Sequence, residues 1–424
     1  MRFPGHRSAK HYFPQTEKAT RLGRVKDGVA RPWYLVGLDH VLVDMELSGS
    51  DELADELGLV PGESVVLDED RLARIGRRIE EMGLSVSYSA GGTVANTLNN
   101  YTHLSGEPAL LLGALQRDIR VGTPAFRYVA QTPKAVDLNH LVAADGTIGI
   151  AITVISPDGE RTFAVAPGVS NDVDAAAIPA EKVEDAAVVL TTLYCMRDEN
   201  LPIASAATKM MELAKQSGVP VAFGLGTASL VRQMRADVRD LLSRYVTVAA
   251  MNAAEAEALT GESDALLACR TILDLVDMVI ITEGARGLTM AGYVEEDYRR
   301  ETDQEIRSKS IPEYNRYEYS RLMRLADCEK PHKVYSHIHP YRGGPDTLSN
   351  TSGAGDAALA AVLHDIAANR YHRATVPDSE KHAAPAPFLT YSSLSRNAQY
   401  GNRVAYEVLR GRSPRIDGPV GPDE

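Results

Sequence analysis

Cysteine, tryptophan and long apolar runs are scarce in this chain of 424 residues. The three cysteines, at positions 195, 269 and 328, are far apart and form no C-x-x-C pair, which excludes a disulfide framework. The longest apolar runs, such as residues 109–115, are much shorter than the roughly 18 residues that a membrane-spanning helix needs. The N-terminus also lacks the apolar stretch of a secretion signal. We therefore expect a cytoplasmic protein without a membrane partner.

Positive charge is also in deficit, because 45 Lys and Arg residues face 57 Asp and Glu residues, for a net charge of −12. This balance argues against nucleic acid as a partner, since a nucleic-acid binder needs excess positive charge to displace counterions from phosphates. The exception is a basic N-terminal arm at 1–32, in which Glu17 and Asp27 are the acidic residues. We interpret it as an arm that lies on the acidic body of its own chain, and the alternative is an arm that binds an anionic partner.

From residue 33 the pattern alternates short apolar runs with longer helical stretches. Helical stretches at 203–217 and 253–260 are followed by Gly218 and Gly261, and glycine commonly ends a helix. The runs expected to be strands are 33–38, 109–115, 187–191, 219–223, 246–250 and 278–282. Alternating strands and helices predict an α/β fold with a central, mostly parallel sheet flanked by helices on both faces. We expect one domain over 33–416 and a C-terminal tail at 417–424.

Two stretches interrupt this alternation. Residues 147–166 contain two β-rich runs around S-P-D-G-E, which predicts a hairpin that could belong to a small separate sheet. Residues 294–349 mix acidic and basic residues with six of the 18 tyrosines. That composition predicts an insertion containing solvent-exposed helix with a partly buried face, either on its own body or against another subunit.

The strongest local motif is N-T-S-G-A-G-D at 350–356, which is followed by an Ala- and Leu-rich stretch. Small residues that open directly into a helix provide unpaired backbone N–H groups and the positive end of the helix dipole, both suited to phosphate. Asp356 would lie in the first helical turn, where a carboxylate is also favoured for purely structural reasons.

Two other phosphate-binding motifs are excluded or weak. The sequence contains no Gly-Lys pair, so it has no P-loop. Residues 353–358 match G-x-G-x-x-A, but the match follows a polar loop and lacks the βαβ context and downstream acid of a dinucleotide fold. NAD is therefore not an expected cofactor.

Further polar and glycine residues follow predicted strands. They are Asp39 and Asp44 in V-G-L-D-H-V-L-V-D, the G-G-T-V-A-N segment at 91–96, Asn252 and Glu255 in M-N-A-A-E, and T-E-G-A-R-G at 282–287. Each alone is more often a turn or a cap. Together they point to a ligand site, because open α/β sheets bind ligands at the carboxyl ends of their strands.

These motifs, in this order, resemble those of the ribokinase-like (PfkB) family of carbohydrate and nucleoside kinases. The family has a D-T-x-G-A-G-D motif, a glycine pair, an N-x-x-E, a T-x-G-x-x-G and a G-E-R-T-F lid segment. The resemblance covers about residues 33–412. It implies a ribokinase-like fold with a small β-sheet lid, with lid strands around 45–48, 83–90 and 147–166.

The resemblance also implies roles for individual residues. Asp356 would be the catalytic base for the nucleoside 5′-hydroxyl, while Gly353, Ala354 and Gly355 would form the anion hole for the transferred phosphate. The residues expected around the sugar are Asp44, Gly91, Gly92 and Asn96, with Asp39 as a further carboxylate at the same strand end.

On the nucleotide side, the resemblance implies ATP and Mg²⁺. Asn252 and Glu255 would organise Mg²⁺ and its waters. The residues expected along ATP are Thr282, Gly284, Gly287 and Asn402, the last near the adenine. Family members that bind K⁺ often carry an acid where this chain has Asn350, so the substitution weakens the expectation of a K⁺ site.

The expected function is ATP-dependent phosphorylation of the 5′-hydroxyl of purine nucleosides, with inosine and guanosine as the substrates that the resemblance favours, in purine salvage. Two alternatives stay open: a related kinase for adenosine or a free sugar, and a non-catalytic nucleoside-binding sensor. The intact G-A-G-D, with Asp356, argues against a sensor. Whether the chain forms a homo-oligomer is left open.

Overall fold

The computed structural model describes residues 34–48, 64–84, 86–155, 161–306, 309–346, 351–379, 387–411 and 413–416. The expected basic arm at 1–32, the tail at 417–424 and Asn350 lie outside these residues.

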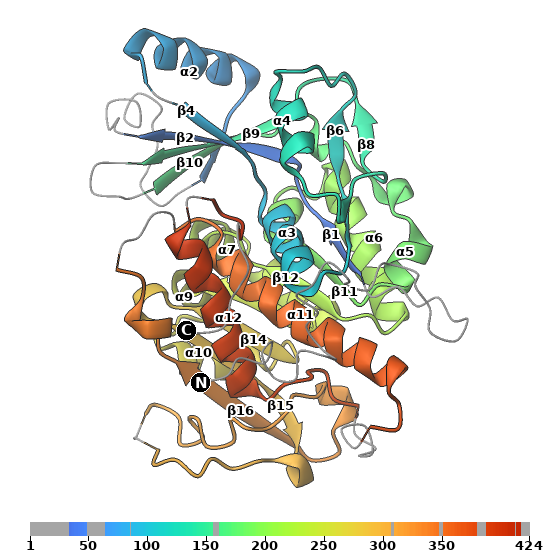
Figure 1. The fold of residues 1–424 in the computed structure, drawn as a ribbon, viewed down its shortest axis with the longest axis vertical. Helices are drawn as coiled ribbons and strands as arrows, with labels where there is room; N and C mark the ends of the chain where they lie inside the picture. The colour runs from blue at the N-terminus through green and yellow to red at the C-terminus, as the bar shows by residue number, and fades with distance from the viewer. Residues whose placement is uncertain are drawn as a thin grey trace.

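A large sheet runs through the body of the molecule (Figure 1). Within the described residues it has nine strands. The pairs β14–β15 and β15–β16 are antiparallel, and all the other neighbouring strands are parallel. In spatial order the strands are β16 (Pro331–Ile338), β15 (Leu288–Glu295), β14 (Met278–Thr282), β13 (Val248–Asn252), β12 (Val221–Gly224), β11 (Val188–Thr192), β1 (Leu35–Leu38), β5 (Ala109–Leu112) and β7 (Val136–Asp137). The predicted α/β fold with a mostly parallel sheet is confirmed.

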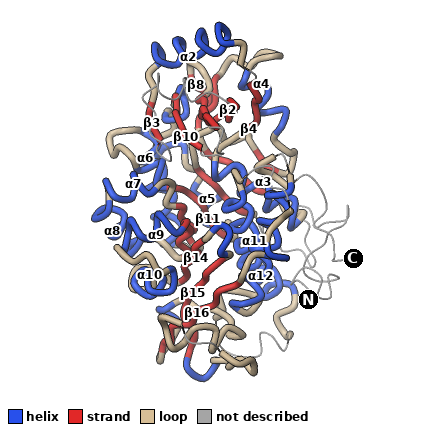
Figure 2. The backbone as a smooth tube through the Cα atoms, turned by 90° about the vertical axis from the view of Figure 1, so that its left-hand side faces the viewer, coloured by secondary structure: helices blue, strands red, loops and turns tan. Residues whose placement is uncertain are grey.

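Helices cover both faces of this sheet because its strands are apolar on both sides (Figure 2). On β1, Leu35 packs into the core of one face, whereas Val36 packs into the core of the other. One face carries α3 (Thr93–Ser105), α4 (Pro124–Gln131), α11 (Ala354–Thr375) and α12 (Leu394–Arg410). The other face carries α5 (Ala180–Glu184), α6 (Pro202–Gln216), α7 (Ala228–Gln233), α8 (Arg235–Tyr245), α9 (Ala253–Thr260) and α10 (Ala265–Ile272).

A smaller sheet of five described strands lies above one end of the large sheet (Figure 1). Its strands, in spatial order, are β3 (Ser64–Val66), β10 (Arg161–Ala166), β9 (Gly149–Ile155), β2 (Leu42–Ser48) and β4 (Val86–Ala90). The predicted hairpin corresponds to antiparallel β9 and β10, and its turn at 156–160 lies outside the described residues. All three segments expected to provide lid strands therefore contribute to this sheet.

The outer face of the smaller sheet is covered by α2 (Glu69–Met82), an element that the motifs did not predict. Met45 and Leu47 on β2 pack with Ile75 and Ile79 of this helix. Because side chains alternate along a strand, Asp44 and Glu46 point to the opposite face, toward the body of the molecule.

The expectation of helix in the insertion at 294–349 is wrong. Its described part contains strand β16 and short 3-10 turns, and β16 pairs with β15 along its whole length. The segment forms a strand and turns because these place Tyr314 and Tyr335 in the core of their own chain, where both are buried. A pair of shorter strands, β6 (Ala114–Gln116) and β8 (Val142–Ala144), completes the described sheets. No described helix is both long and apolar enough to span a bilayer.

Candidate active site at the carboxyl ends of the strands

Helix α11 starts beside the carboxyl ends of the parallel strands and carries Asp356 in its first turn. Gly353 is the N-cap in the left-handed conformation, with φ +78°, which a residue with a Cβ rarely adopts. A Cβ on Gly353 would also lie 2.3 Å from the carbonyl oxygen of Pro414. Nothing lies within 4 Å of the position that a Cβ on Gly355 would take, and Ala354 is partly exposed. The helix start is therefore open to a ligand.

Asn96 of α3 meets Asp356 across the site, with its Nδ2 donating to Oδ2 of the carboxylate at 3.5 Å. Burial raises the pKa of Asp356 to about 7, and the hydrogen bond from Asn96 opposes that rise. A carboxyl group with such a pKa exchanges protons in the neutral range, as a general base must.

Asp44 lies against the glycine pair that precedes α3. A Cβ on Gly91 would be 2.1 Å from Oδ1 of Asp44, so only glycine permits this approach. Gly92 is the N-cap of α3, with φ +94°. Burial raises the pKa of Asp44 to about 7 as well. The negative charge of Asp44 adds to the rise in the pKa of Asp356.

Arg415 is the basic residue of this group, and the sequence reasoning missed it. Its Nε donates to Oδ1 of Asn96 at 2.9 Å, and the backbone N–H of Ile416 donates to Oδ1 of Asn100 at 2.9 Å. The positive charge of Arg415 acts to lower the pKa of both Asp44 and Asp356. Arg415 stands in a short S-P-R segment after the last helix, which matches no known motif, so the sequence gives no signal that it belongs to the site.

The carboxylate oxygens of Asp39, in contrast, accept hydrogen bonds from other residues of the chain. Its Oδ2 accepts from the backbone N–H of Val94 at the start of α3 at 3.2 Å, and its Oδ1 accepts from the backbone N–H of His40 at 2.8 Å. Thr192 donates to the same Oδ1 at 3.4 Å. The carboxylate therefore holds the end of β1 to the start of α3, and this geometry favours a structural part over contact with a sugar.

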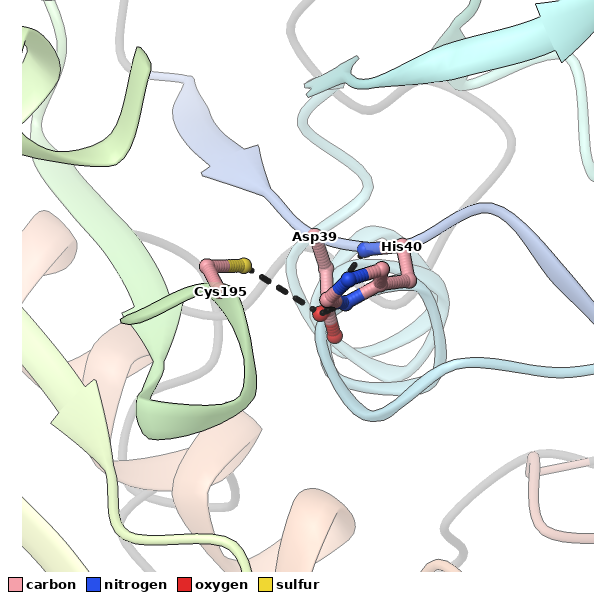
Figure 3. A group of neighbouring side chains, drawn as sticks. All are labelled: Asp39, His40 and Cys195. Atoms are coloured by element: carbon pink, nitrogen blue, oxygen red, sulfur yellow. Dashed lines mark hydrogen bonds and ion pairs between the residues drawn. The ribbon is translucent and has the colours of Figure 1, made fainter. Parts of the chain in front are cut away.

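Asp39, His40 and Cys195 form a buried cluster (Figure 3). Cys195 Sγ lies 3.6 Å from Asp39 Oδ1, and His40 Nε2 lies 2.9 Å from Oδ1 of Asn171. Burial alone would lower the pKa of His40, but its hydrogen bond to Asp39 raises it to about 10. The cluster is thus organised around an ion pair between His40 and Asp39.

Asn252 and Glu255 form a capping box at the start of α9. The Asn252 side chain accepts from the backbone N–H of Glu255 at 2.9 Å, while the Glu255 carboxylate accepts from the backbone N–H of Asn252 at 3.0 Å. Burial raises the pKa of Glu255 to about 8, and the charge of Asp356 adds to the rise. Glu255 is therefore close enough to Asp356 for their charges to interact.

The other nucleotide-side candidates gather where β14 ends. Asn252 and Thr282 are register partners on β13 and β14, so they lie side by side. Gly284 is exposed, whereas Gly287 is buried and a Cβ there would be 2.0 Å from the carbonyl oxygen of Ile338. Asn402 of α12 donates to the carbonyl oxygen of His339, just beyond β16, at 2.5 Å. Gly287 therefore needs glycine for packing, while Gly284 faces open space.

Comparisons with known proteins identify the family of the chain. Residues 70–307 match the model of the pfkB family carbohydrate kinases. The guanosine-inosine kinase of Escherichia coli strain K12 is 43% identical over 418 residues, which cover 98% of this chain and 96% of that protein. The guanosine-inosine kinase of Escherichia coli O157:H7 matches with the same identity and coverage.

Solved structures share the fold at low sequence identity. A probable sugar kinase from Rhizobium etli CFN 42 has a TM-score of 0.68 at 16% identity, covering 92% of this chain and 97% of that one. An adenosine kinase from Sinorhizobium meliloti has a TM-score of 0.68 at 16% identity, covering 91% of this chain and 97% of that one. The family model, the full-length relatives and the shared fold agree with the resemblance in the ordered motifs: the chain belongs to the pfkB family of carbohydrate kinases.

Proposed function

We propose that the chain transfers the γ-phosphoryl group of ATP to the 5′-hydroxyl of guanosine and inosine. The observation that carries the proposal is the pair formed by Asn96 and Asp356 at the open start of α11, with Asp44 close by. The near full-length similarity to guanosine-inosine kinases supports the choice of substrate. The products would be IMP and GMP, as in purine salvage.

In this proposal Asp44 receives the ribose hydroxyls, since a carboxylate accepts two hydrogen bonds from a diol. Gly91 and Gly92 would pack against the sugar, and Asn96 would contribute a further hydrogen bond. The 5′-hydroxyl then faces Asp356. The smaller sheet acts as a lid over the ribose and excludes water, which limits wasteful hydrolysis of ATP.

Asp356 orients the 5′-hydroxyl and accepts its proton as the oxygen bonds to phosphorus. Phosphoryl transfer has a loose transition state, so positioning and charge stabilisation contribute more than strong basicity. The backbone N–H groups at Gly353, Ala354 and Gly355 would stabilise the charge on the transferred group, with help from the dipole of α11.

The nucleotide side fits a magnesium complex of ATP. The buried Glu255 supplies carboxylate oxygens, which Mg²⁺ prefers, and it lies within the electrostatic reach of Asp356. Asn252 and Glu255 would hold the ion through water, and Thr282, Gly284, Gly287 and Asn402 would lie along ATP. Bound Mg²⁺ would neutralise charge on the phosphates. Guanosine or inosine and ATP would be the partners of this site.

The test is ATP consumption, with Mg²⁺, in the presence of guanosine, inosine, adenosine, cytidine, ribose or fructose 6-phosphate. Turnover with guanosine or inosine well above all others is expected. Turnover with adenosine or a free sugar alone would overturn the substrate assignment but keep the phosphotransfer. Binding of guanosine without any turnover would replace the kinase with a nucleoside sensor.

A further inference from the structure

A cavity of about 780 Å³ opens beside the proposed ribose site, between β4, α3, α4 and the segment Ser413–Ile416. Its size is within the roughly 300–1,000 Å³ range of small-molecule sites. Arg415 lines the cavity and also donates to Asn96, which contacts Asp356. One wall of the cavity is therefore continuous with the proposed reaction centre. Polar side chains that line it include Glu46, Ser87, Ser89, Asn99 and Gln131.

Glu46 extends the proposed ribose-binding face of β2 toward this cavity. It is two residues beyond Asp44, so both side chains point to the same face and stand about 7 Å apart along the strand. The register of β2 and β4 places Ser87 opposite Glu46 and Ser89 opposite Asp44. The negative charge of Glu46 acts on Asp44, which agrees with their proximity. A sugar held at Asp44 would thus direct its base along the strand toward Glu46.

The carboxylate of Glu46 has no hydrogen-bond or ion-pair partner within the described part of the chain, although the residue is only partly exposed. Asp44, in comparison, lies within the field of Arg415. An ionised carboxylate is an acceptor-only group, so it seeks donors. With no hydrogen bond from a described residue, the Glu46 carboxylate is free to accept from water or from a ligand that enters the cavity.

Purine bases differ in what they offer to such a group. Guanine presents N1–H and an exocyclic amino group side by side, which match the two oxygens of a carboxylate. Hypoxanthine also presents N1–H. Adenine carries an unprotonated N1, an acceptor whose lone pair would face the negative charge. A carboxylate at the base edge therefore favours 6-oxopurines and disfavours adenine.

We propose that Glu46 selects the base, accepting hydrogen bonds from N1–H of guanosine and inosine and from the amino group of guanosine. This inference rests on the proposed function, because it names how the same site chooses among nucleosides. Glu46 does not take part in the chemistry of phosphoryl transfer. Glu46 instead determines which purine nucleoside binds with its 5′-hydroxyl in position for the reaction.

The test compares kcat/KM for guanosine, inosine and adenosine in the wild type and in Glu46→Gln. A site built around a hydrogen bond discriminates strongly against a base that cannot make it, so we expect the ratio of guanosine to adenosine to fall by about 100-fold or more. Adenosine turnover should stay level or rise. Glu81→Gln is the matched control, because Glu81 is an exposed residue of α2 that pairs with Arg78 on the outside of the same sheet. It should leave the ratio unchanged.

Purine riboside provides a second measurement, since it lacks both the 6-oxo group and the N1 proton without adding bulk. The wild type should reject it relative to inosine, and Glu46→Gln should reject it much less. A wild type that prefers guanosine, combined with a Glu46→Gln variant of unchanged selectivity, would overturn the role of Glu46 alone. A wild type that does not phosphorylate guanosine or inosine would overturn the proposed function together with this inference. A uniform loss for all nucleosides would assign Glu46 to general support of Asp44, which also contradicts base selection.

Discussion

Arg415 reaches back from the last described segment of the chain to Asn96, with Nε and Oδ1 2.9 Å apart. Asn96 in turn donates to Asp356. One arginine thus joins a segment beyond α12 to the start of α3 and to the carboxylate at the start of α11. The positive charge lies among Asp44, Asp356 and Asn96, where a purely acidic group would repel an incoming phosphate.

Replacing this charge should shift the pH dependence of the reaction. Burial raises the pKa of Asp356 to about 7, so wild-type kcat/KM should fall as the pH drops through that value and the base becomes protonated. The charge of Arg415 acts to lower this pKa, so Arg415→Met should raise it and move the acid limb to higher pH. The measurement is kcat/KM for guanosine from pH 5 to 9.

The matched control for Arg415→Met is Arg410→Met, because Arg410 is an exposed arginine that lies beside Glu407 on α12. Its acid limb should coincide with that of the wild type. An acid limb that does not move in Arg415→Met would show that this arginine does not tune the carboxylates.

Asp356→Asn should remove the proton acceptor while keeping the shape of the site. We expect kcat to fall by about 10³-fold or more, within the range attributed to general bases. Nucleoside affinity should be largely retained, because the proposed ribose contacts come from Asp44 and Asn96. Single-turnover kinetics and calorimetric binding of guanosine check the two halves of this prediction. A variant that retains most of the activity would show that Asp356 is not the catalytic base.

Glu255→Gln should weaken the use of Mg²⁺ without unfolding α9. Glutamine at this position still completes a capping box, so the melting temperature should change little. The Mg²⁺ concentration that gives half-maximal activity should rise roughly 10- to 100-fold, as for residues that orient a metal's ligands. The measurement is a Mg²⁺ titration at fixed ATP and guanosine. An unchanged midpoint of the Mg²⁺ titration would show that Glu255 acts only as part of the helix cap.

Asp39→Ala should act on stability. It would leave the backbone N–H of Val94 without its partner and the positive charge of His40 without its counter-ion. Breaking a buried pair in this way costs about 3–5 kcal/mol. Urea unfolding should show the loss, and Asp39→Asn, which keeps one acceptor, should show a smaller one. A stable variant with a strongly raised KM for guanosine would instead indicate that Asp39 contacts the sugar.

Much of the architecture could be predicted from the sequence because its signals are local. The apolar run at 278–282 became β14, and the helix expected at 253–260 is α9, ended by Gly261 in the left-handed conformation. The first-turn position of Asp356 followed from a motif that opens directly into a helix. Each of these depends on neighbours a few residues apart, so periodicity and glycine positions were sufficient.

The parts that could not be predicted depend on contacts between distant residues. Tyr335 is buried by a strand pairing with β15, and its charged neighbours obscured that pattern in the sequence. Arg415 is placed by bonds to α3 more than 300 positions earlier. The difference between Asp39 and Asp44 could not be predicted either, because both follow the same apolar run and only long-range hydrogen bonds, from Val94 and Thr192, occupy the Asp39 carboxylate.

The path of Ser413–Ile416 beside the start of α11 has a consequence for biosynthesis. A chain is made from its N-terminus, and domains begin to fold during synthesis. All the described strands and helices precede Arg415, so the sheets can assemble on the ribosome before that side chain exists. Asn96 and Asp356 would then lack their basic neighbour until Ser413–Ile416 has been made and has packed against α3 and the start of α11. The pKa of the Asp356 carboxyl would thus reach its final value only after this segment is in place.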